Sequence, residues 1–155
     1  MGLSQSTSER LKSQLDSLPL LFSGASPEAM RRRPPSGKWS AHENLAHLAR
    51  YHEVFLERLR RMLTENRPHL ARYRAENDPE AGPWMALPTD ALLKEMERLR
   101  GELIDAVEHL SPGEFERTGI HPVLGEMSIP TWIEFFLVHE AHHLYVALMR
   151  SRGGG

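Results

Sequence analysis

The stretch from Pro130 to Arg150 constrains the fold more than any other part of the chain. Its sequence, PTWIEFFLVHEAHHLYVALMR, would be apolar almost all round a helix, yet it carries three histidines within five residues. A helix that is apolar on nearly every side belongs in a protein core. Burying an imidazole there is costly unless the ring has a partner. We therefore expect these histidines to have a specific role in the core.

Two of these histidines have the spacing of a metal clamp. His139 and His143 are four residues apart, so on a helix both rings project from one face about one turn apart. The string HEAHH (139–143) also fits HExxH, the zinc-protease motif whose glutamate is the general base. A zinc protease of this type places its third ligand downstream, whereas residues 144–155 contain no His, Asp or Glu. No substrate-aligning strand is predicted either, so we reject the protease interpretation.

Apolar residues recur at helical spacing in four long segments. The predicted helices cover residues 6–22, 40–65, 89–110 and 130–150. The first contains Pro19, which is expected to kink or end its last turn. The second has the clearest start, because Ser40 and Glu43 have the form of a capping box. Thr89 can cap the third helix.

Two long connections, residues 66–88 and 111–127, separate the later helices. They contain prolines and glycines and show no strand-like alternation of useful length. Connections this long in a compact domain tend to be functional or to cross over the bundle. The pattern predicts an all-α fold, a four-helix bundle with long connections, in which sites are built in the core from facing helices. We expect a single domain over residues 1–155, with residues 151–155 as a disordered tail.

Composition excludes several classes of function. The chain of 155 residues contains no cysteine, which excludes disulfides, thiolate zinc sites and a cysteine nucleophile. Any metal must then be held by His, Asp or Glu, and any thiol in the reaction must arrive with a substrate. The formal net charge of -2 argues against a nucleic-acid partner, and Arg58, Arg60 and Arg61 are expected on a solvated helix face. With neither a membrane span nor a signal peptide in the sequence, we expect a soluble, cytoplasmic protein without a membrane partner.

Most of the nine histidines are expected to be structural. These are His42 in a first helical turn, His52 on an apolar stripe, His69 and His121 in predicted loops, and His109 near a helix end. His47 differs, because on the second predicted helix it lies in line with Glu43 and Tyr51 and faces a groove beside the main packing seam. It is the natural third ligand to complete the clamp of His139 and His143.

The motifs, taken together, resemble a known family. The string GKWS (37–40) is followed by Glu43 and His47, and the string HEAHH (139–143) comes much later in the chain. In this order and spacing they are similar to the DinB-like superfamily of four-helix bundles, which includes the bacillithiol and mycothiol S-transferases. The resemblance covers both motif helices and the overall length of the chain.

The resemblance implies a ligand set and an assembly. It implies that His47, His139 and His143 bind a divalent metal ion and that the protein is a homodimer. Two departures concern the surroundings of the site. Members often have an acidic residue soon after the first histidine, where this chain has AR (49–50), and many continue the histidine pair with RGQ, where this chain has LYV (144–146). These departures leave the ligands intact and predict a different substrate pocket.

Three neutral imidazoles leave a divalent ion with at least one open position, which is typical of a catalytic site. Such ligands suit Zn or Ni, with Fe as a further candidate. The first hypothesis is a divalent-metal-dependent transferase that activates a low-molecular-weight thiol cosubstrate for attack on a small-molecule substrate. The second is a hydrolase that uses a metal-bound hydroxide, with Glu43, Tyr51 and Glu140 as candidate catalytic proton carriers. The third is a non-catalytic stress-response binding module with a structural metal.

Overall fold

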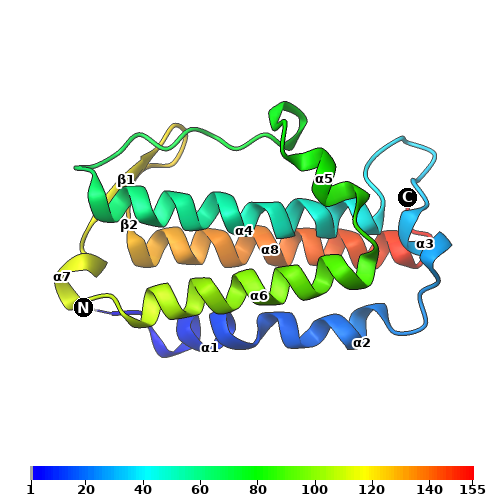
Figure 1. Ribbon diagram of the computed structural model, residues 1–155, viewed down its shortest axis with the longest axis horizontal. Coiled ribbons are helices and arrows are strands. Elements are labelled where there is room, and N and C mark those ends of the chain that lie inside the picture. Colours follow the sequence, from blue (N-terminus) through cyan, green and yellow to red (C-terminus); the bar gives the residue numbers. More distant parts are fainter. Residues whose placement is uncertain (1) are drawn as a thin grey trace.

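The computed structural model describes residues 2–155 and is a four-helix bundle (Figure 1), as predicted. Three long helices pack with an N-terminal segment that makes the fourth member, and α4 contacts both α6 and α8. The long helices are α4 (Ala41–Thr64), α6 (Thr89–Glu108) and α8 (Ile129–Ser151). The N-terminal segment consists of α1 (Gln5–Ser13), the 3₁₀ turn η1 (Gln14–Ser17) and α2 (Leu18–Phe22). The other short helical elements are α3 (Pro27–Arg31), η2 (Ala75–Asn77), α5 (Ala81–Ala86) and α7 (Pro112–Phe115).

The first predicted helix is broken before its proline. Pro19 lies in the first turn of α2. A proline ring inside a helix clashes with the carbonyl four residues earlier, here that of Leu15, and the chain takes 3₁₀ geometry at this place. Within the 3₁₀ turn, the Gln14 side-chain amide donates to the Leu137 carbonyl (3.2 Å) and to the Glu140 carboxylate (2.8 Å) of α8. The break therefore becomes a polar contact between the first and last helices.

The starts of the two middle helices differ in how well they follow the prediction. At α4, the Ser40 hydroxyl accepts from the Glu43 N–H (3.1 Å) and the Glu43 carboxylate accepts from the Ser40 N–H (2.8 Å), so the capping box is confirmed. The predicted Thr89 cap is wrong, because Pro88 occupies the cap position and Thr89 is the first residue of α6. The Thr89 hydroxyl lies 2.9 Å from Nδ1 of His42 instead.

A buried ionic network joins four of the helices, α1, α4, α6 and α8. Arg100 of α6 forms an ion pair with Glu140 of α8, and their side chains are 4% and 0% exposed. Arg100 also donates to Nε2 of His52 on α4 (3.2 Å) and to the Leu11 carbonyl (2.8 Å). Burial lowers the pKa of His52 to about 4, so the neutral ring donates through Nδ1 to the Leu48 carbonyl (2.8 Å) while Nε2 accepts. These hydrogen bonds complete an ion pair that is costly to desolvate.

The expectation of no strands is wrong in the second long connection. There β1 (Thr118–His121) and β2 (Gly125–Ser128) form an antiparallel hairpin. Each strand has four residues, which is too short to show an alternating pattern in the sequence. A Cβ at Gly119 would lie 2.8 Å from Cδ1 of Leu70, so a larger residue here would require the Leu70 and Met62 side chains to move. The Leu70 N–H donates to the Ile120 carbonyl (2.9 Å) at this junction.

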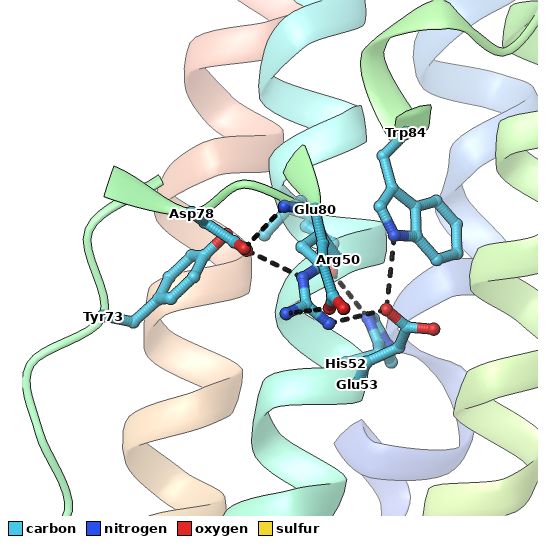
Figure 2. Close-up of polar contacts among 8 residues, drawn as sticks. Arg50, His52, Glu53, Tyr73, Asp78, Glu80 and Trp84 are labelled. Atoms are coloured by element: carbon cyan, nitrogen blue, oxygen red, sulfur yellow. Dashed lines mark hydrogen bonds and ion pairs between the residues drawn. The ribbon is translucent and has the colours of Figure 1, made fainter. Parts of the chain in front are cut away.

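The first long connection, residues 66–88, lies along α4 and is attached to it by Arg50 (Figure 2). Arg50 projects from α4 and donates to the Asp78 carboxylate through Nε (2.7 Å). It also forms ion pairs with Glu53 on its own helix (2.8 Å) and with Glu80 of the connection (2.7 Å). One arginine thus holds two acidic residues of the connection against the helix.

The end of the chain stays close to the bundle. Ser151, the first residue of the predicted tail 151–155, is the last residue of α8 and is buried. The Gly154 N–H donates to the Met149 carbonyl (2.8 Å), and the Gly154 carbonyl accepts from Arg150 (2.9 Å). None of the helices within residues 2–155 combines the length and apolar character needed to cross a membrane.

We expect Glu140→Gln to lower the free energy of unfolding by about 3–5 kcal/mol, because Arg100 would remain buried without an opposite charge. Urea unfolding followed by circular dichroism measures this loss. The control is Glu134→Gln on the same helix, which removes an ion pair with Arg10 whose side chains are both 39% exposed. That change should cost less than about 1 kcal/mol. Equal losses in the two variants would contradict the central role of the buried pair.

Candidate metal centre

Three histidines from two helices meet at one place. His47 projects from α4, while His139 and His143 project from α8. One ring nitrogen from each lies within 4.8 Å of the other two. Among residues 2–155 this is the only group of three or more His, Asp or Glu side chains with that mutual proximity. The structure therefore brings together the three residues predicted as ligands.

The spacing of the rings fits a single ion. The Nε2 atoms of His47 and His139 are 3.1 Å apart. Two nitrogens that bind one ion at about 2.0–2.1 Å are separated by roughly 2.9–3.4 Å, for bond angles between octahedral and tetrahedral values. A donor set of three imidazoles suits Zn, Ni or Fe.

Asn44 sets the orientation of the third ring. Its Oδ1 accepts from Nδ1 of His143 (2.8 Å), and its Nδ2 donates to the Ser40 carbonyl (2.8 Å). The contact with the carbonyl decides which end of the amide faces the histidine. Nδ1 of His143 therefore carries the proton, and the Nε2 lone pair is available to a metal.

The other two rings are oriented by packing. Nδ1 of His47 and Nδ1 of His139 are both buried without a hydrogen-bond partner among the described residues. The His47 ring stacks on Tyr73, with centroids 5.6 Å apart and planes at 19°, and its centroid is 5.1 Å from that of Trp39. The His139 ring lies 4.3 Å from the Tyr51 ring. Aromatic side chains thus hold both rings in place.

Burial keeps the three imidazoles neutral. It lowers the pKa of His47 to about 4. Burial, together with the charges that neighbouring histidines would carry, lowers the pKa of His139 to about 2 and that of His143 to about 3. All three rings are therefore neutral at neutral pH, and a neutral imidazole has the nitrogen lone pair that binds metal.

Tyr51 presents a hydroxyl beside the histidines. Arg58, further along α4, donates from Nη1 to the Tyr51 oxygen (2.7 Å), so the phenolic proton is left to be donated elsewhere. Burial raises the pKa of Tyr51 and Arg58 opposes that effect, so the net shift is upward and the hydroxyl is protonated at neutral pH. The Tyr51 hydroxyl thus has a proton that is free to form a hydrogen bond in the cavity that Tyr51 lines.

The histidines line a cavity of about 730 Å³ between α4, α8, the hairpin and the first long connection. Trp39, Tyr51 and Phe135 supply part of its aromatic lining. Tyr73 supplies another part, and its hydroxyl donates to Asp78 (2.9 Å), the residue that Arg50 ties to α4 (Figure 2). The attachment of the long connection therefore also positions one wall of the cavity.

The structure separates the three residues predicted as proton carriers. Tyr51 lines the cavity. Glu43 is engaged in the capping box and in an ion pair with Arg33, and Glu140 is buried against Arg100. Neither carboxylate lines the cavity. His142, the neighbour of the clamp, is exposed.

Sequence reasoning missed Asn44, Arg58 and His121. Arg58 was expected on a solvated face but is only 6% exposed and lines the cavity. Its spacing from His47 and Tyr51, eleven and seven residues, places it on the same helical face and could have revealed it. His121 was expected in a loop, whereas it ends β1, is 7% exposed and also lines the cavity. No pattern in the sequence points to that position.

The chain is similar to several known proteins, among them the following three. OB0782 of Oceanobacillus iheyensis, which bears the name "putative metal-dependent hydrolase", is 32% identical over 109 residues, which are 70% of this chain and 63% of that protein. The uncharacterized protein YuaE of Bacillus subtilis is 27% identical over 135 residues, with 78% of this chain and 82% of YuaE covered. YfiT from Bacillus subtilis, described as a probable metal-dependent hydrolase with an unusual four-helix bundle topology, shares the fold with a TM-score of 0.76. It is 19% identical, and the match covers 99% of this chain and 92% of YfiT.

These similarities agree with the family resemblance found from the sequence motifs GKWS (37–40) and HEAHH (139–143). The chain spans less than two thirds of the length of OB0782 (63%) but most of YuaE and YfiT. The family model of the DinB superfamily matches residues 10–147, a segment that includes α4, α6 and all three histidines of the site. The chain therefore belongs to the DinB superfamily, and the resemblance found in its sequence is confirmed.

Proposed function

We propose that the protein is a metal-dependent hydrolase of a small-molecule substrate, with a divalent ion held by His47, His139 and His143. The observation that carries the proposal is the convergence of three neutral imidazoles, one buried and two partly buried, at the wall of a large cavity. A structural zinc site is normally closed by four protein ligands, whereas three leave room for a reacting molecule. The relatives OB0782 and YfiT bear names of the same class of enzyme.

Side chains around the metal centre would orient the substrate and limit the access of water. When bound, the ion supplies a Lewis acid that lowers the pKa of a nucleophile beside it. Tyr51 donates its phenolic proton in a hydrogen bond to an oxygen of the substrate, while Arg58 holds the Tyr51 oxygen from the other side. Trp39 and Tyr73 pack against His47 and limit the access of water to its ring.

A second candidate is the transfer of a low-molecular-weight thiol. Glu76 is the only carboxylate among the described residues that line the cavity, and it is exposed, so no buried carboxylate base accompanies the histidines. A thiol ionises with a pKa of about 8.5, against about 15.7 for water, and needs less help from a base. Because the chain has no cysteine, such a thiol would be a cosubstrate.

We expect the purified protein to bind a divalent ion, and His47→Ala and His143→Ala to weaken that binding by more than about 100-fold, because even changes behind the ligands cost 10–100-fold. Elemental analysis and titration against a competing chelator measure the affinity. His142→Ala is the matched control, since this exposed neighbour of His143 should leave the affinity unchanged. A wild-type protein that binds neither Zn nor Ni would overturn the assigned site.

Asn44→Ala should weaken metal binding by about 10–100-fold, because His143 would lose the acceptor that fixes its protonated nitrogen. The same chelator titration measures the change, and circular dichroism establishes that the variant is folded. Asn66→Ala, at an exposed position beyond the end of α4, is the control. Equal affinities for the Asn44 variant and the wild type would exclude an orienting role.

We expect hydrolysis of ester, amide or phosphoester substrates by the zinc- or nickel-loaded protein without added thiol. Chelation should abolish turnover, restored metal should recover it, and His139→Ala should remain inactive. Turnover that requires a thiol and forms a thioether or thioester product would select the transferase. A fully loaded protein that turns over none of these substrates, with or without thiol, would contradict both candidates.

A further inference from the structure

We propose that the cavity beside the three histidines contains an anion subsite, in which Arg58 and His121 bind a carboxylate or phosphate group of the substrate. This inference rests on the proposed function, because it names the class of substrate that the same cavity accepts. Its basis is a buried positive charge that the protein itself does not neutralise.

The two buried arginines of the core differ in their partners. Arg100 is 3% exposed and pairs with Glu140, so its charge is neutralised inside the protein. Arg58 is 6% exposed, and no carboxylate of residues 2–155 lies within ion-pair distance of it. A charge removed from water without a counter-charge is strongly unfavourable. An anionic ligand in the cavity that Arg58 lines would supply the missing charge.

The Arg58 guanidinium is held in place and still has free donors. Nη1 donates to the Tyr51 hydroxyl (2.7 Å) and Nη2 to the Ala71 carbonyl (2.7 Å). Its central carbon lies 5.5 Å from the Tyr51 ring centroid and 5.3 Å from that of Trp132, which fixes the group by cation–π contacts. A guanidinium has five N–H groups, so the two bonds found among the described residues leave three for a ligand. This preorganised fork matches the two oxygens of a carboxylate or phosphate.

His121 contributes a second donor from the hairpin. Its Nδ1 accepts from the N–H groups of Val123 and Leu124, both at 3.1 Å. Nδ1 therefore has no proton, and the proton of the neutral ring is on Nε2. Nε2 has no hydrogen-bond partner among residues 2–155, although the side chain is buried and lines the cavity. The hairpin turn thus fixes the orientation of His121 and leaves its Nε2–H free to donate to a ligand.

The charged side chains that line the cavity are mostly positive. Besides Arg58, the exposed Arg72 and Arg74 line the cavity, and the only carboxylate of the lining within the described chain is Glu76. Neither Arg72 nor Arg74 makes an ion pair within the part of the chain that the structure describes. Three guanidinium groups against one carboxylate attract an anion toward the cavity.

Tyr51 connects the anion subsite to the metal centre. Arg58 donates to the Tyr51 hydroxyl, and the Tyr51 ring lies 4.3 Å from the His139 ring. A substrate whose anionic group binds Arg58 would therefore present its neighbouring atoms to Tyr51 and the histidines. Binding energy from the anionic group would serve to position the reacting bond.

The test is titration of the zinc-loaded protein with inorganic phosphate, acetate and acetamide, at constant ionic strength. Binding is followed in ¹H–¹⁵N spectra by the indole signal of Trp132, which lies against Arg58. We expect phosphate or acetate to shift this signal and acetamide, which has the shape of acetate without its charge, to leave it in place. Comparison of the two anions shows which oxyanion the subsite prefers.

Two variants test the assignment to residues. Arg58→Gln should weaken the anion affinity by about 10-fold or more, since hydrogen bonds to charged groups are the stronger class. His121→Gln, a change in the hairpin that leaves the helices untouched, should weaken it by a smaller factor and keeps the test valid if Arg58→Gln does not fold. Arg61→Gln, on α4 and paired with Glu65, is the control and should bind anions like the wild type.

The titrations are repeated on the metal-free protein to separate this inference from the proposed function. Anion binding that persists without zinc and is lost in the Arg58 or His121 variants supports the subsite, even if no hydrolysis is found. Anion binding that requires zinc and is equal in wild type and both variants would assign the anion to the metal and overturn the subsite. A protein that hydrolyses substrates but binds neither phosphate nor acetate would also overturn it, while leaving the hydrolase proposal intact.

Discussion

The rotation of α8 about its own axis decides what the site contains, and the buried pair of Arg100 and Glu140 holds that rotation. Successive residues of a helix are about 100° apart, so His139 and Glu140 face different sides although they are neighbours in the sequence. Arg100 and Gln14 hold the carboxylate in the core. His139 consequently faces His47 and the cavity. An ion pair that never touches the cavity thus determines which residues of HEAHH line it.

Those parts of the site that depend on helical spacing could be predicted from the sequence. His139 and His143 share a face because they are four residues apart, and the capping box at Ser40 and Glu43 defines where α4 begins, so His47 lies within a helix. Glu140 could not be placed in the same way. Its partner Arg100 is 40 residues away in the sequence, and no local pattern relates the two. The sequence therefore left Glu140 among the candidate proton carriers.

The cavity walls were harder to predict than the ligands, because short irregular segments supply many of them. His121 is fixed by two backbone N–H groups of its own turn, a geometry that depends on the hairpin and on the close approach at Gly119. Asn44 orients His143 only because Ser40 fixes its amide. The four-helix bundle itself was predictable, since long amphipathic segments carry a strong periodic signal, whereas two four-residue strands carry almost none.

The way in which the first long connection is attached to α4 allows its sequence to vary without disturbing the bundle. The Tyr73 wall is attached to α4 through Asp78 and Arg50 (Figure 2), and Arg58 of α4 donates to the nearby Ala71 carbonyl. The three histidines, in contrast, are carried by helices packed into the core. Insertions or replacements in this connection can reshape the wall without displacing the helices that carry the histidines. This wall of the cavity and the three histidines are therefore carried by different parts of the chain. The same bundle can keep the three histidines in place in related proteins whose cavity walls differ.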